Sequence, residues 1–231
     1  LDNIRKRSKS LSEEQVEGLV ATYDGGVRHV DAVLEELIEG WRADGLLDNA
    51  ILIITSDHGE SLGQRYGRIK GHGKMFEDGL HVPLIVRFPD GFRAGEREAG
   101  RVSLVDIVPT VLEAAGLELD ARLPGVSLRQ TPSPERLIMA SRPPSRAYYS
   151  GPWKVVTFDK DPSMLFNLDE DPLELDAPKH AGRAEGMGLE LEAAIQARWA
   201  SRPAFDAPAI PAGAYEKQMR AQLDALGYAG D

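Results

Sequence analysis

The chain has 231 residues, enough for one large domain or for a domain with a small second one. A formal net charge of −10 argues against nucleic acid or an anionic membrane as partner, although a metal ion can reverse the local field for an anionic substrate. Cysteine is absent, which excludes a disulfide, a thiolate metal site and a cysteine nucleophile within this sequence. No apolar run reaches the roughly 18 residues of a membrane-spanning helix. We interpret Leu1 as a cut or processed end and assign no compartment.

The first part of the chain predicts a long helix. Ser12 and Gln15 have the spacing of a capping box, in which each side chain accepts a hydrogen bond from the other residue's backbone. Apolar residues then recur at helical spacing until Gly45, which ends the helix. In this interpretation Gly25 and Gly26 either kink the helix or split it in two.

Two short apolar runs, Ile51–Ile54 and Val82–Val86, bracket a polar, glycine-rich loop. The first run is β-branched and unbroken, which is typical of a strand buried on both faces of an α/β sheet. Asp57 and His58 follow its carboxyl end, where open α/β sheets place their ligands. Because Asp supplies a hard oxygen and His a borderline nitrogen, the two side chains can face one metal ion.

A structural interpretation of this pair is an Asp that caps the next helix, beside a surface His. The rest of the loop favours chemistry, because acids, imidazoles and a lysine gathered between two buried strands are a poor design for a mere connector. These residues are Glu60, His72, Lys74 and Glu77.

After the second strand, the sequence predicts a short strand at 102–105 and then a helix capped by Asp106 and ended by Gly116. We assign this segment a structural role, since only Asp106 in it could perform chemistry and that residue serves as the cap. The predicted buried face of the helix consists of Ile107, Val108, Val111, Leu112 and Ala115.

The last third predicts an antiparallel sheet with helices. Strand patterns cover 137–141, 148–149, 153–158 and 165–168, and helical patterns cover 188–199 and 215–226. The acids of the turn at 169–174 do not fit an EF-hand, which needs alternate Asp positions, a central Gly and a closing Glu. No linker is long or polar enough to separate independent domains, so we expect a docked subdomain over 131–231.

Three segments, TSDHGESLG, GHGK and FEDGLHVPLIV, together resemble the carboxyl-terminal half of a sulfatase, within the alkaline-phosphatase-like superfamily. VSLVDIVPTVLEAAGL resembles the segment that closes the family's main sheet, and GPWKVV with LFNLDEDPLEL resembles its small terminal sheet. The resemblance implies an α/β fold: residues 1–130 form part of a mixed sheet flanked by helices, and 131–231 form the small antiparallel sheet subdomain. It also implies that an amino-terminal half is missing here.

The resemblance implies a sulfuric ester hydrolase acting on a small-molecule or saccharide sulfate ester. Asp57 and His58 match the pair that ligates a divalent ion, usually Ca²⁺. Lys74 matches the lysine that contacts the sulfate or bridging oxygen, and His72 is a candidate proton donor or substrate contact. The loop is shorter than the family pattern, so Lys70 stays an alternative to Lys74. Arg65 and Arg68 are alternative residues for the substrate entrance.

The family's nucleophile, a formylglycine made from Cys in a C-x-P-S-R motif, is absent, as are two further metal-binding aspartates. Two protein ligands fall short of the roughly six to eight oxygens that Ca²⁺ prefers. We therefore expect this polypeptide alone to be inactive and to bind calcium weakly or not at all. Without amino-terminal strands, the main sheet would expose an edge or an apolar face, so we expect a partner copy or a crystal neighbour to cover it, or else poor solubility.

Two other functions stay open. A phosphatase or phosphonate monoester hydrolase of the same superfamily would use Mn²⁺ or Zn²⁺, ions that suit His58 better than they suit an Asn. A non-catalytic fragment is favoured by the missing half and disfavoured by the intact Asp-His-Gly sequence.

Overall fold

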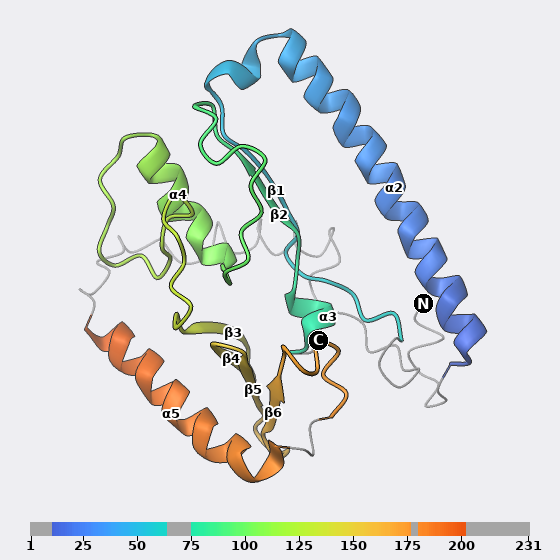
Figure 1. The fold of residues 1–231 in the computed structure, drawn as a ribbon, viewed down its shortest axis with the longest axis vertical. Helices are drawn as coiled ribbons and strands as arrows, with labels where there is room; N and C mark the ends of the chain where they lie inside the picture. Colours follow the sequence, from blue (N-terminus) through green and yellow to red (C-terminus); the bar gives the residue numbers. More distant parts are fainter. Residues whose placement is uncertain (1–10, 64–74, 177–179, 202–231) are drawn as a thin grey trace, which may run out of the picture.

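The structure is a computed structural model that describes residues 11–63, 75–176 and 180–201. Its amino-terminal part contains the long helix α2, a two-stranded sheet and helix α4, and its carboxyl-terminal part contains a four-stranded sheet with helix α5 along it (Figure 1). The predicted helix at 215–226 lies outside the described residues. None of the described helices is both long enough and apolar enough to cross a membrane.

Helix α2, Glu13–Ala43, is continuous over 31 residues. The capping box is confirmed: the Gln15 N–H donates to Ser12 Oγ at 3.3 Å, and the Ser12 N–H donates to Gln15 Oε1 at 3.0 Å. Gly25 and Gly26 lie inside the helix without splitting it. Gly45 follows the end of the helix with a φ of 73°, a left-handed conformation that glycine adopts without a steric penalty.

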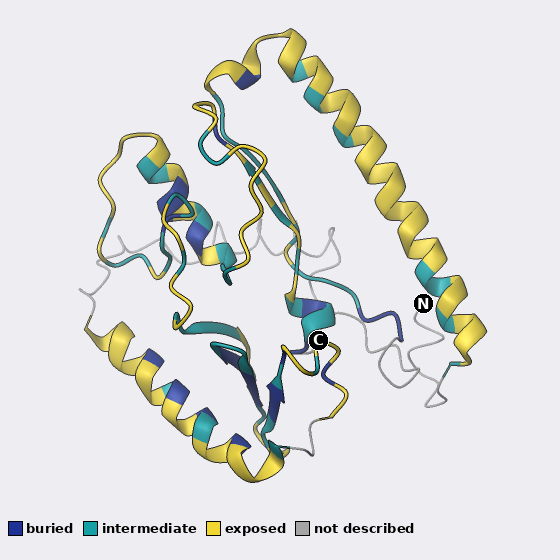
Figure 2. Ribbon diagram, viewed as in Figure 1, coloured by how far each residue is buried: buried dark blue, intermediate teal, exposed yellow. Residues whose placement is uncertain are grey.

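The apolar stripe of α2 faces solvent in the described structure. The helix contains no buried residue, and Figure 2 shows it exposed over almost its whole length. The exposed apolar side chains recur at helical spacing, so they form one face. We call this set the α2 stripe: Tyr23, Val27, Val30, Val33 and Leu37.

After the short 3₁₀ helix η1, Leu46–Asn49, strand β1, Leu52–Thr55, pairs antiparallel with β2, Leu84–Arg87. Two strands thus bracket the polar loop, as predicted. Burial of the first strand on both faces is wrong: Leu52, Ile53 and Ile54 of β1 are only partly buried, Thr55 is exposed, and Ile85 of β2 is 59% exposed. Such burial needs a packed layer on each face, whereas in the described residues this sheet consists of two strands only.

The predicted strand at 102–105 is wrong, because the chain forms the 3₁₀ helix η2, Leu104–Asp106, which leads into α4, Ile107–Ala114. Ser103 and Asp106 exchange capping bonds that tighten this segment into a turn. The predicted buried face of α4 is also wrong. Pro109 and Thr110 are buried, whereas Val108 and Val111 are exposed.

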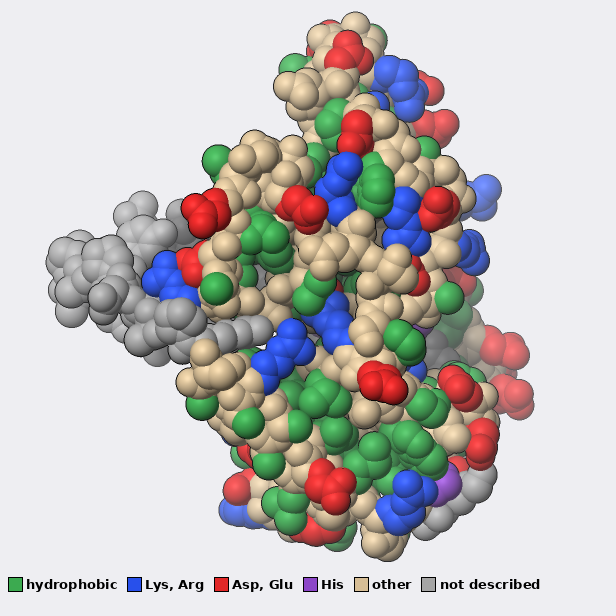
Figure 3. Space-filling model, turned by 60° about the vertical axis from the view of Figure 1, so that its left-hand side comes forward, with side chains coloured by type: hydrophobic (Ala, Val, Ile, Leu, Met, Phe, Trp, Pro, Cys, Tyr) green, Lys and Arg blue, Asp and Glu red, His purple; other side chains and the backbone are tan. Residues whose placement is uncertain are grey.

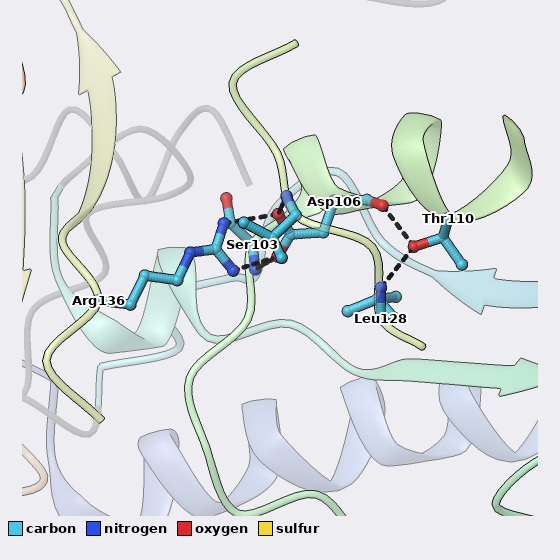
Figure 4. A network of polar contacts seen from close by, with 6 residues as sticks. Ser103, Asp106, Thr110, Leu128 and Arg136 are labelled. Atoms are coloured by element: carbon cyan, nitrogen blue, oxygen red, sulfur yellow. Dashed lines mark hydrogen bonds and ion pairs between the residues drawn. The ribbon is translucent and has the colours of Figure 1, made fainter. Parts of the chain in front are cut away.

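Asp106 is fully buried and makes no side-chain cap to α4, contrary to the prediction. Its carboxylate instead accepts hydrogen bonds from the Ser103 and Val126 N–H groups, each at 2.8 Å. It also accepts hydrogen bonds from both terminal nitrogens of Arg136, at 2.6 and 2.7 Å (Figure 4). Bidentate pairing of this kind is among the strongest hydrogen-bonded arrangements, so Asp106 joins three separate segments. Its predicted structural role therefore holds through a different set of contacts.

The carboxyl-terminal antiparallel sheet is confirmed, with strand order β3-β4-β5-β6. Helix α5, Ala181–Ala200, begins earlier than predicted and packs its small and aliphatic side chains on one face of the sheet. The strands are β3, Ile138–Arg142; β4, Ser145–Ser150; β5, Trp153–Thr157; and β6, Met164–Asn167.

Each face of this sheet carries its own apolar core, because successive residues of a strand point to opposite faces. Tyr148 and Val155 face α5. Tyr149 and Phe166 face the other way and pack against the segment that returns from the polar loop, which contains Phe76. The predicted domain boundary at residue 130 stays a prediction. The core that contains Phe76 and Phe166 includes residues from both sides of this boundary.

Candidate functional site

The predicted metal ligands lie on the turn that follows β1. Thr55 Oγ1 at the end of this strand donates to the carbonyl of Pro83 at 2.8 Å, which ties the turn to the start of β2. Ser56 Oγ donates to the carbonyl of His58 at 2.7 Å and curls the chain back on itself. Asp57 therefore lies at the carboxyl end of a strand, on a turn that the side chains of Thr55 and Ser56 stabilise.

Asp57 and His58 are close in space as well as in sequence. The His58 N–H donates to Asp57 Oδ1 at 3.0 Å, and His58 Nε2 lies 3.8 Å from Asp57 Oδ2. Both side chains reach solvent, with 57% of Asp57 and 36% of His58 exposed. Between this turn and residue 63 the described chain forms no helix, so the alternative role of Asp57 as a helix cap is not observed.

The backbone fixes the orientation of the imidazole. His58 Nδ1 lies 2.9 Å from the Gly59 carbonyl oxygen. A carbonyl can only accept, so Nδ1 carries the hydrogen, and a neutral ring then has its lone pair on Nε2. Metal-binding histidines are commonly held by such a bond from the other ring nitrogen. In this tautomer the nitrogen nearer to Asp57 is therefore the one able to bind a metal ion.

The pair fits a shared cation but does not complete a metal site. A separation of 3.8 Å between Nε2 and Oδ2 lets one ion contact both atoms, because Ca²⁺–ligand distances are about 2.3–2.6 Å. Among the described residues, no group of three or more His, Cys, Asp or Glu side chains could hold a metal ion. His72, Lys74 and the alternative Lys70 lie outside the described residues.

We call the turn that carries Asp57 and His58 the ligand turn. Gly59 connects it to helix α3, Glu77–Leu80. Its N–H donates to the Gly79 carbonyl at 2.9 Å. A Cβ on Gly59 would lie 2.2 Å from the carbonyl oxygen of Asp78, closer than side chains are found to approach a backbone atom. Glycine is needed here because two backbones approach each other, and the position of α3 is thereby coupled to the turn.

Next to the start of α3 lies a group of polar side chains that we call the Lys154 cluster, which consists of Lys154, Glu77, Glu174 and Tyr149. Lys154 Nζ, from β5, is 2.8 Å from Glu77 Oε1 and 2.7 Å from Glu174 Oε1. The Tyr149 hydroxyl donates to Glu77 Oε1 at 2.7 Å, and Glu174 Oε2 accepts the Glu77 N–H at 2.7 Å. The Lys154 and Glu174 side chains are completely buried.

Electrostatics hold Glu77 as an anion and Tyr149 as a neutral donor. Burial raises the pKa of the Glu77 carboxyl, but the charge and hydrogen bond of Lys154 outweigh it, so the pKa lies below its ordinary value of 4.5. Burial, followed by the Glu77 charge, raises the pKa of the Tyr149 hydroxyl well above 10.0. Arg101, whose guanidinium carbon is 5.2 Å from the Tyr149 ring centre, adds positive charge nearby.

Sequence reasoning singled out Glu77 without a role, and it placed Lys154 in a strand and Glu174 in a turn without assigning either of them to the site. The signal was present in WKVV, where Lys154 shares a strand face with Val156. A lysine at a core position of a strand requires a buried acidic partner. No comparable local signal identifies which acids supply it, because they lie far away in sequence.

Comparison with known proteins places the chain in a family. The family model described as Sulfatase matches residues 3–117. Arylsulfatase K from Bos taurus is 33% identical over 186 residues, a match that covers 71% of this chain and 34% of that protein. Choline-sulfatase from Rhizobium meliloti (strain 1021) is 33% identical over 177 residues, with the same 71% and 34% coverage. The chain belongs to the sulfatase family and spans about a third of the length of these relatives.

Solved structures agree on the fold. A structure in complex with its substrate, D-glucosamine-2-N,6-O-disulfate, is 26% identical, with a TM-score of 0.63, and the match covers 77% of this chain and 40% of that one. The phosphonate monoester hydrolase of Agrobacterium radiobacter is 25% identical, with a TM-score of 0.67, over 81% of this chain and 43% of that one. The chain thus has the α/β architecture of the alkaline-phosphatase-like superfamily, as predicted.

Proposed function

We propose that this chain is part of a sulfatase-like hydrolase that cleaves sulfate esters. The observation that carries the proposal is the pairing of Asp57 and His58, 3.8 Å apart on the turn after β1, in a chain with sulfatase relatives. The two side chains are proposed to supply two ligands of a divalent ion, with Ca²⁺ favoured. When bound, such an ion would offset the negative charge of the sulfuryl oxygens.

The chain's own residues would orient and neutralise the ester. Asp57 contributes an anionic oxygen, and the Nδ1–H bond to the Gly59 carbonyl holds the His58 ring. Lys74 is proposed to contact the sulfate or bridging oxygen as a positive charge that strengthens as water is excluded. His72 is proposed as a proton donor or substrate contact. Both of these lie outside the described residues, and the sequence contains no cysteine for the family's nucleophile, so this polypeptide alone is proposed to be inactive.

The proposed substrate is a sulfate ester of a small alcohol or a saccharide. The names of the two sulfatase relatives and the sulfated glucosamine bound by a structural neighbour support this class. Basic and acidic side chains are interspersed on the face shown in Figure 3, so this face has no continuous basic surface. An extended polyanion would favour a continuous basic surface.

Phosphonate monoester hydrolysis is the second candidate. The phosphonate hydrolase fold neighbour, with a TM-score of 0.67, supports it. The imidazole of His58 also suits Mn²⁺ or Zn²⁺. The two candidates differ in the metal that the Asp57-His58 pair prefers, which a direct binding measurement can compare.

Isothermal titration of the full chain with Ca²⁺, Mn²⁺ and Zn²⁺ tests the metal pair. We expect weak binding of one ion that falls about tenfold or more in both Asp57→Ala and His58→Ala. Glu118→Ala is the matched control, because it removes an exposed carboxylate elsewhere and should leave the affinity unchanged. Equal affinities in wild type and the two ligand variants would overturn the proposal. Turnover of a chromogenic aryl sulfate well above a Lys74→Ala variant would contradict the expected inactivity of the isolated chain.

A further inference from the structure

The contacts of Lys154 reach across the fold toward the ligand turn. Lys154 lies in the middle of the carboxyl-terminal sheet, yet its ammonium group contacts Glu77, the first residue of α3. Glu77 is also held by the Tyr149 hydroxyl on β4 and, through its own N–H, by Glu174 after β6. Three separate parts of the carboxyl-terminal region thus fix the start of one short helix.

Helix α3 passes this constraint to the ligand turn. The Gly79 carbonyl accepts the Gly59 N–H at 2.9 Å, and Gly59 has no room to move toward Asp78. The Gly59 carbonyl in turn lies 2.9 Å from His58 Nδ1. The path from the Lys154 ammonium to the His58 ring therefore consists of direct contacts and one four-residue helix.

The buried charges and backbone conformation of the Lys154 cluster indicate that it positions α3 rather than that it mainly stabilises the fold. Burying charges costs free energy, and well-packed apolar residues of similar volume are often at least as stabilising as a buried ion pair. Glu174, moreover, has a φ of 54°, a left-handed conformation that residues other than glycine seldom adopt. The chain thus keeps both a desolvated ion pair and an unfavourable backbone conformation in order to place one carboxylate beside Lys154 and the Glu77 N–H.

We propose that Lys154, Glu77 and Glu174 are positioning residues that set the geometry of the Asp57-His58 pair through α3 and Gly59. The carboxyl-terminal sheet then acts on the site without contacting an ion or a substrate. The relevance to metal binding rests on the proposed function, whereas the mechanical coupling to Gly59 and His58 does not.

The experiment compares three variants of the full chain. Lys154→Met removes the ammonium, and the triple variant Lys154→Met/Glu77→Gln/Glu174→Gln replaces all three charged groups with neutral ones, so it keeps the test valid if the single variant fails to fold. Arg136→Met is the matched control, because it also breaks a buried ion pair, the one with Asp106. None of the contacts described for Arg136 involves Gly59 or α3.

Amide hydrogen exchange at Gly59 and the imidazole NMR signals of His58 report on the coupling without any metal. We expect Gly59 exchange about tenfold faster and displaced His58 signals in the triple variant, with neither change in Arg136→Met after correction for global stability. Identical Gly59 exchange and His58 signals in the triple variant and Arg136→Met would overturn the proposal.

Metal titration of the same proteins separates this proposal from the proposed function. If wild type binds an ion, the triple variant should bind it about tenfold more weakly, as when residues supporting metal ligands are lost, while Arg136→Met should stay within twofold. Equal weakening in both would overturn a positioning role. If wild type binds no ion, the proposed function fails, and the exchange and NMR measurements still decide the coupling.

Discussion

Lys154 Nζ lies 2.8 Å from Glu77 Oε1, so a fully buried ammonium joins the carboxyl-terminal sheet to the helix that supports the candidate metal ligands. The carboxyl-terminal sheet is therefore connected to α3 by a buried ion pair as well as by apolar contacts. Its second apolar core, which includes Phe76 and Phe166, holds the same segment by packing. Charge and packing act together at this junction, and their separate contributions can be measured.

Replacing Lys154 with Met should destabilise the chain by about 3–5 kcal/mol, because it removes one partner of a buried ion pair, the ammonium that contacts the Glu77 and Glu174 carboxylates. Urea unfolding followed by circular dichroism measures the loss. Lys160→Met, at an exposed position, serves as control and should change the free energy of unfolding by less than about 0.5 kcal/mol. A loss below about 1 kcal/mol in Lys154→Met would show that the ion pair is unimportant for stability.

Glu77 should make stability depend on pH in the acid range. Its pKa in the folded chain is below its ordinary value of 4.5, so the unfolded chain binds the proton more tightly. The stabilisation is present above about pH 4.5 and is lost as the pH falls through the folded-state pKa. Urea unfolding of wild type and Glu77→Gln between pH 7 and pH 3 should give a stability difference that shrinks toward low pH. A difference independent of pH would exclude this linkage.

Gly59→Ala should test the close approach of the ligand turn to α3. The added Cβ would lie 2.2 Å from the Asp78 carbonyl oxygen, so one backbone must shift, at a cost of about 1–3 kcal/mol in the free energy of unfolding. Gly186→Ala is the control: its Cβ meets nothing within 4 Å, and it should stabilise helix α5 by about 0.5–1 kcal/mol. Thermal or urea unfolding compares the two, and a Gly59→Ala protein as stable as wild type would contradict the model of tight backbone contact.

Local sequence signals predicted the elements that local chemistry determines. The capping box at Ser12 and Gln15, the strands around the polar loop and the antiparallel sheet all agree with the structure. The segment at 102–105 was mistaken for a strand because its apolar run outweighed the capping pair of Ser103 and Asp106.

Patterns failed wherever the answer depends on a distant partner. Helical spacing revealed an apolar face on α4, but it could not reveal that the described chain buries Pro109 and Thr110 instead. The same limit applies to the Lys154 cluster, whose members come from three regions of the sequence. For the candidate site, the Asp-His-Gly sequence indicated Asp57 and His58 as metal ligands, which stays a prediction, whereas the contact of Gly59 with Gly79 required the folded structure.

The α2 stripe should drive self-association of this chain. Five large apolar side chains form one exposed face on a helix that has no buried residue, and contiguous apolar surface of this kind is commonly an interface. We propose that a second copy covers it, since α2 against its equivalent would bury the same face on both chains.

Light scattering should therefore give a mass above that of a single chain, and this mass should rise with protein concentration. Val27→Gln/Val30→Gln/Leu37→Gln should return the mass to one chain, whereas Ala32→Gln on the opposite face of α2 should leave association unchanged. A wild-type chain that stays monodisperse and monomeric over the whole concentration range rules out this role for the stripe.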